Sequence, residues 1–287
     1  MQLLNFIAQQ NTVNLSLRLT LATFLLVPVG DFLVRPIILS LALIGLVFRS
    51  QLHKQILWLA LTILTAIRVL VDWPLADNHA YLLCYWCLAI FIALYVNQTK
   101  QCLALNARLL IGFVFLFATI WKLVLSSDYA DSQFFRVIMI TDSRFEGFTQ
   151  LVAGLSKQQI EGLRNLVEPS VYNTAANLNS SVQLSTRFNL VASIASYWNI
   201  VINAMIALAF MWPVERGFSK VRDVLLLLFC IVTYAVATVE GFGWLLLAMG
   251  IAQCRPDRIF TLLMYVGTFV LILFYREIPW AELLSKL

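Results

Sequence analysis

The stretch IGFVFLFATIWKLVL, residues 111–125, decides the fold class of this chain. It is apolar apart from Thr119 and Lys122, and a run of this kind predicts a helix that crosses a lipid bilayer. A charged side chain inside such a helix is costly, so Lys122 is a candidate for a functional site. A lysine that is held out of water can also lose its proton near neutral pH and act as a base.

The composition of the whole chain agrees with this stretch. Hydrophobic residues make up 61% of the sequence and charged residues 12%, with a mean hydropathy of +0.84. Soluble domains have about 45–50% apolar and about 25% charged residues. We therefore predict an all-α fold, a polytopic transmembrane helical bundle in contact with the lipid bilayer, that occupies residues 1–287 as one domain. The net charge of +5 needs no nucleic acid, because basic residues in short loops set membrane topology.

Apolar runs that approach the roughly 20 residues needed to cross a bilayer mark the spans. We expect eight or nine, at about 15–29, 33–48, 55–71, 80–97, 107–126, 188–212, 222–239, 241–254 and 257–275. The eighth is short, and a re-entrant hairpin is the alternative. An extramembrane segment of about 128–187 is expected on the non-cytoplasmic side. In it, residues 156–163 are typical of a capped amphipathic helix and residues 173–186 of a loop.

Basic residues orient the predicted spans. They follow the second, fourth, sixth and eighth spans, whereas the alternate loops are poor in lysine and arginine. The positive-inside rule then places the N-terminus in the cytoplasm and His79, Lys122 and Glu240 toward the non-cytoplasmic side. Arg68 and Asp72 are an i,i+4 pair at the same depth. Consecutive antiparallel spans are usually neighbours, so we expect His79 and Lys122 to converge.

Each candidate also has a simpler interpretation. Lys122 can extend its stem so that the ammonium reaches the headgroups, and His79 can be a solvated residue at the start of a helix. Glu240, beside two glycines, is typical of a turn. The aromatic residues Trp86, Phe113, Phe117 and Trp121 can line a pocket for a quinone ring, although such residues more often pack or anchor a helix at the interface.

The cysteines and histidines limit the redox and metal chemistry that we expect. Cys84 and Cys87 form a C-x-x-C pair that either exchanges thiols with disulfides or serves as two small apolar residues one helical turn apart. The chain has two histidines and no zinc-binding motif, so we predict no metal site.

Three motifs resemble the vitamin K-dependent γ-glutamyl carboxylases. The first is FATIWKL, residues 117–123, followed by the pair Asp128-Tyr129 and the pair Phe134-Phe135. The second is NHAYL, residues 78–82, just before a span, and the third is FGWLLLA, residues 242–248. The resemblance is good over about 75–136 and weaker elsewhere. The chain thus resembles the HTTM (horizontally transferred transmembrane) bundles, to which the carboxylases belong.

The resemblance implies a mechanism. In the carboxylases, the matched lysine deprotonates reduced vitamin K, oxygen converts the hydroquinone to an epoxide, and a strong base then removes a glutamate γ-proton so that carbon dioxide adds. Carried over, Lys122 is the catalytic base and His79 its partner. From their own positions in the sequence, we also expect Trp86, Phe117, Trp121 and Glu240 to bind the substrate. A reduced quinone is the implied cofactor. We expect a truncated relative without the family's large lumenal substrate domain.

Two functions remain open from the sequence. One is an integral membrane enzyme that acts, through Lys122 and His79, on a quinol-like or other lipophilic substrate at the outer face. The alternative is a non-catalytic subunit, an assembly or scaffold protein of a larger membrane complex. The enzyme requires Lys122, whereas the scaffold tolerates its replacement.

Overall fold

The computed structural model describes residues 12–27, 29–74, 76–171, 185–214, 216–237, 239–255 and 257–278. Over these ranges all regular secondary structure is helical, as the composition predicts.

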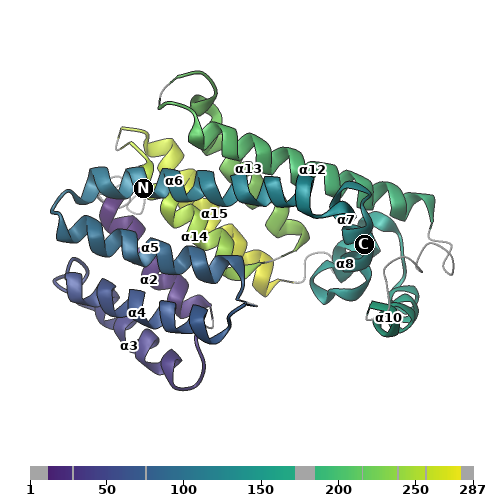
Figure 1. Cartoon of the computed structure of the whole chain (residues 1–287), viewed down its shortest axis with the longest axis horizontal. Coiled ribbons are helices and arrows are strands. Elements are labelled where there is room, and N and C mark those ends of the chain that lie inside the picture. The colour runs from purple at the N-terminus through teal and green to yellow at the C-terminus, as the bar shows by residue number, and fades with distance from the viewer. Residues whose placement is uncertain are drawn as a thin grey trace.

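Nine long helices form the bundle in the described part of the chain (Figure 1). They are α2 (Thr12–Leu26), α3 (Val34–Val47), α4 (Gln55–Val71), α5 (Asn78–Tyr95), α6 (Thr99–Ile120), α12 (Thr186–Met211), α13 (Arg222–Val236), α14 (Glu240–Gln253) and α15 (Ile259–Glu277). Each coincides with one predicted segment. Three stretches, Asn78–Tyr95, Thr99–Leu125 and Thr186–Met211, are long and apolar enough to cross a membrane. Five further apolar helices have 10–17 residues, so the total of eight or nine spans stays a prediction.

Large apolar side chains cover the outside of the bundle. On α3, for example, Ile37, Leu43 and Val47 are 52%, 50% and 69% exposed. Exposed apolar surface of this kind is typical of a membrane-facing or partner-facing protein. The boundary that differs most from the prediction is the start of α6, which lies at Thr99 and not at 107. The added turns are amphipathic, because Leu103 is buried whereas Lys100 is exposed.

Helix α14 lies at the centre of the bundle, between α2, α6, α13 and α15. Residues 243–253 are all buried, as expected for a helix that is apolar on every side. It is one continuous helix, so the re-entrant hairpin is not what forms. Two glycines permit the close packing. A Cβ atom on Gly243 would lie 2.5 Å from Tyr234 Cζ, and one on Gly250 would overlap the ring of Tyr265.

A second, smaller core lies at one end of the bundle, beside the start of α12 (Figure 1). It is built on the helices α7 (Ser127–Ala130), α8 (Gln133–Thr141) and α10 (Lys157–Val171). The start of α10 has the predicted cap. Ser156 Oγ accepts from Gln159 N at 3.3 Å, and Ser156 N donates to Gln159 Oε1 at 2.8 Å. Of the predicted loop 173–186, residues 173–184 lie outside the described part of the chain.

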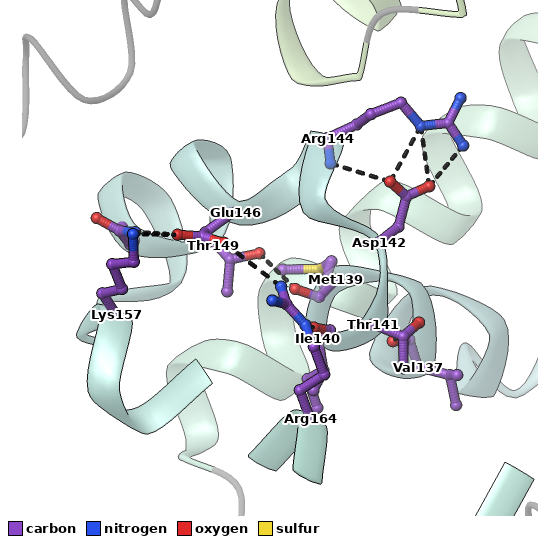
Figure 2. A network of polar contacts seen from close by, with 11 residues as sticks. Val137, Met139, Ile140, Thr141, Asp142, Arg144, Glu146, Thr149, Lys157 and Arg164 are labelled. Atoms are coloured by element: carbon purple, nitrogen blue, oxygen red, sulfur yellow. Dashed lines mark hydrogen bonds and ion pairs between the residues drawn. The ribbon is translucent and has the colours of Figure 1, made fainter. Parts of the chain in front are cut away.

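Charged groups hold this smaller core together (Figure 2). The carboxylate of Glu146 lies 3.4 Å from Arg164 Nη2 and 3.8 Å from Lys157 Nζ. Arg164 Nε also donates to the carbonyl oxygen of Ile140 at 3.0 Å. Arg164 therefore joins α10 to the end of α8 through Ile140, and to the short helix α9 (Glu146–Phe148) through Glu146.

The two ion pairs of Glu146 are expected to differ in strength. Glu146→Gln should lower the local stability of α8 and α10 by about 1 kcal/mol, because the side chains of Glu146 and Arg164 are only 19% and 22% exposed. Lys157→Gln should change it much less, because Lys157 is 65% exposed. Amide hydrogen exchange over residues 133–165 measures both. Equal effects of the two substitutions would contradict the assignment.

Candidate functional site

A groove of about 1100 Å³, which we call the lysine groove, lies between α5, α6 and α12. Apolar side chains form most of its walls, among them Leu82, Leu110, Phe113, Phe115, Phe117, Trp121, Phe229 and Phe242. A few polar side chains also line it, namely Asp77, Asn78, His79, Lys122, Asn199 and Asn203. A large apolar cavity with few convergent polar groups is typical of a site for a lipophilic small molecule.

Lys122 points into this groove and not out of the bundle. It is 8% exposed, whereas the next residues, Leu123 and Val124, are 59% and 73% exposed. The structure therefore does not show the extended conformation in which the Lys122 ammonium would reach the headgroups. Lys122 lies in a single π-helical turn, Trp121–Leu125, that continues α6. Such turns rotate the side chains of a helix by one position and are frequent at functional sites.

The ammonium of Lys122 faces an aromatic ring. Its Nζ lies 5.3 Å from the ring centroid of Tyr129, a cation–π distance. No carboxylate among the described residues forms an ion pair with it. An amine without a fixed counter-ion can exist in the neutral form. A neutral amine is the first requirement for a lysine base.

Tyr129 belongs to an aromatic cluster at the end of the groove. Its ring stacks on Phe134 at 4.3 Å and meets Trp121 edge-on at 5.6 Å. Burial raises the pKa of the Tyr129 phenol, so this residue stays neutral at physiological pH. The groove thus presents an uncharged ring to Lys122 in place of a phenolate that would pair with it.

His79 lines the groove from the start of α5, as predicted. Its Nε2 lies 3.8 Å from Asp77 Oδ2. His79 also lines a smaller cavity of about 120 Å³ that contains the predicted Arg68–Asp72 pair, in which Nη2 and Oδ2 are 2.7 Å apart. His79 therefore lines two cavities. It shares one of them, the lysine groove, with Lys122.

Of the other predicted site residues, some line the groove and some do not. Phe117 and Trp121 line the groove and are 64% and 47% exposed, so they form its open side. Trp86 is not in the groove. It is fully buried and its Nε1 donates to Thr20 Oγ1 at 2.9 Å, because this position lies on the face of α5 that packs on α2. Glu240 begins α14, and its side chain lies outside the described part of the chain.

Two asparagines that the sequence analysis did not select complete the polar lining. Asn199 and Asn203 lie one turn apart on α12, and Asn203 Nδ2 donates to Asn199 Oδ1 at 3.0 Å. Asn203 is 3% exposed. Two amides at i,i+4 in an apolar helix were a detectable signal, because polar side chains inside a span usually face its interior.

The C-x-x-C pair has the surroundings of packing residues. Cys87 is fully buried, and Cys84 Sγ lies 3.9 Å from the carbonyl oxygen of Thr62. Both thiols are free. Over the described residues, no three His, Cys, Asp or Glu side chains are grouped as a metal site.

In comparisons with known proteins, no family model, curated protein or solved structure matches the chain.

Proposed function

We propose that this chain is an integral membrane protein of eight or nine spans, related to the vitamin K-dependent carboxylases and other HTTM bundles, in which Lys122 is a base for a quinol-like lipophilic substrate. One observation carries the proposal. Lys122 is buried on an apolar groove, and its ammonium has an aromatic ring beside it and no carboxylate partner among the described residues. A lysine used only to anchor a helix at the interface would extend toward water.

The groove fits a substrate that comes from the bilayer. Its exposed aromatic side, Phe113, Phe117 and Trp121, lies on a helix long and apolar enough to span a membrane. A hydroquinone ring can enter there and lie against these side chains, with one hydroxyl directed at Lys122. In the proposed step, the hydroxyl proton moves to neutral Lys122 Nζ, which leaves a hydroquinone monoanion and a lysine ammonium. His79 and Asn203 supply hydrogen bonds to the oxygens.

The proposed orientation places this chemistry on the non-cytoplasmic side. Arg49, Arg216 and Arg255 belong to the links α3–α4, α12–α13 and α14–α15, which lie at one end of the bundle (Figure 1). Lys122 and Tyr129, which line the lysine groove, belong to the turn after α6 and to α7, at the other end. By the positive-inside rule the end with the basic links is cytoplasmic, and so is the N-terminus.

Protection of Lys122 from chemical modification tests the proposed site. We expect a reduced short-chain naphthoquinone to slow the reaction of Lys122 with a membrane-permeant amine reagent at least about tenfold, because a bound ring covers Nζ. Lys157, which is 65% exposed, serves as the internal control and should react at an unchanged rate. Peptide mass spectrometry reads both residues in one sample. Lys122 that reacts like Lys157, with or without quinol, would favour the scaffold alternative.

A further inference from the structure

Another cavity lies at the opposite end of the bundle from the lysine groove. This cavity, which we call the basic hollow, has a volume of about 310 Å³. On one side it is formed by the 3-10 turn η5 (Gly217–Val221) and the start of α13, and on the other by the link between α14 and α15. Its lining is Val214, Ser219, Lys220, Arg222, Asp223, Arg255 and Arg258.

Four of these seven residues are cationic and one is anionic. The anionic residue, Asp223, is 7% exposed and already engaged. Its Oδ1 accepts from Tyr265 Oη at 2.8 Å and from Gln253 Nε2 at 3.3 Å, and lies 3.8 Å from Arg222 Nε. The hollow therefore has a surplus of positive charge around a carboxylate that is held by its own neighbours.

The four cations are not all neutralised by carboxylate partners. Arg255 Nε donates to Asp257 Oδ1 at 3.1 Å, so that arginine has a carboxylate partner. Lys220 and Arg258 are exposed and form no ion pair with a described residue. They come from links that are far apart in the sequence, yet they line one cavity. The positive-inside rule explains why these links are positively charged, but it does not require their side chains to converge on one cavity.

We propose that the basic hollow binds a phosphate group, either the headgroup phosphate of an anionic lipid or free inorganic phosphate. Basic pockets between helices on the cytoplasmic side of a membrane protein recognise this chemistry. Arginine supplies a planar fork of donors that matches phosphate oxygens, and lysine adds a point charge. Ser219, which is 4% exposed, adds a hydroxyl donor at the wall.

The test compares two paired substitutions at the same end of the molecule. Lys220→Gln with Arg258→Gln removes two cations from the basic hollow. Arg49→Gln with Lys54→Gln removes two exposed cations from the link between α3 and α4, which is not part of the hollow. The purified full chain, in a neutral detergent, is titrated with phosphatidylglycerol, with phosphatidylcholine, and separately with inorganic phosphate. Native mass spectrometry measures lipid binding, and the thermal unfolding temperature measures the effect of either ligand.

We expect the unsubstituted chain to prefer phosphatidylglycerol to phosphatidylcholine, or to be stabilised by inorganic phosphate. The Lys220–Arg258 variant should bind that ligand at least about tenfold more weakly, and the Arg49–Lys54 variant should bind it as before. A response to the lipid alone identifies a headgroup as the source, and a response to inorganic phosphate identifies the free ion. Equal losses in both variants, or no response to either ligand, would overturn the proposal.

Discussion

Lys122→Met is expected to lower the oxygen-dependent consumption of a reduced quinone by at least about a hundredfold, because general-base catalysis contributes roughly 10²–10⁴ to a rate. Methionine has the length and flexibility of the lysine stem, so it fills the same space on the groove wall. It has no atom that accepts a proton from a hydroxyl group under these conditions. The loss should appear in kcat, with the affinity for the quinol largely retained.

Lys122→Arg should be as inactive as Lys122→Met, because a guanidinium stays protonated and cannot serve as a base. The thermal unfolding temperature separates this result from misfolding. Lys122→Met should unfold at the same temperature or higher, since it removes a buried ionisable amine that has no carboxylate partner among the described residues. Lys157→Met, on the exposed surface of α10, is the matched control. Retained turnover in Lys122→Arg would exclude Lys122 as the base.

Gly250→Ala is expected to destabilise the bundle by about 1–3 kcal/mol, the usual cost of overpacking a close-packed core. The added Cβ would overlap the ring of Tyr265, which is fully buried. That ring cannot turn aside without cost, because its hydroxyl donates to Asp223 at 2.8 Å. The substitution therefore strains the contact between α14 and α15, and with it the hydrogen bond to Asp223, which lines the basic hollow.

Gly267→Ala is the control for this substitution. Gly267 lies on α15, it is exposed, and a Cβ there meets nothing within 4 Å. Alanine has the higher helix propensity, so this variant should be unchanged or stabilised by up to about 1 kcal/mol. Thermal unfolding of both variants in the same detergent measures the difference. A Gly250→Ala variant as stable as Gly267→Ala would show that α14 and α15 pack less closely than the structure indicates.

Helix positions were predictable here because they depend on local composition. Apolar runs and the polar residues between them locate each bundle helix, and Ser156 with Gln159 forms the capping box that their spacing predicts. The Arg68–Asp72 pair forms for the same local reason. The meeting of His79 and Lys122 on one groove was also predictable, because alternating basic loops give the orientation of successive helices and neighbouring helices in the chain usually pack together.

Which side of a helix faces which neighbour was not predictable in this chain. A helix that is apolar all round, such as α14, gives no periodic signal for its buried face, so its central place had to come from packing. For the same reason Trp86 was assigned to the groove, although it packs on α2.

The sequence by itself determined the helical class and the order of the helices, and it singled out Lys122 as a charged residue inside an apolar helix. Only the tertiary structure decided how that lysine is presented, through the π-helical turn at 121–125 and the ring of Tyr129. It also brought Asn203 to the groove and joined two distant basic links into one hollow. The physical reason is that helix formation depends on neighbours in the chain, whereas the direction of a side chain depends on close packing between segments that are far apart in sequence.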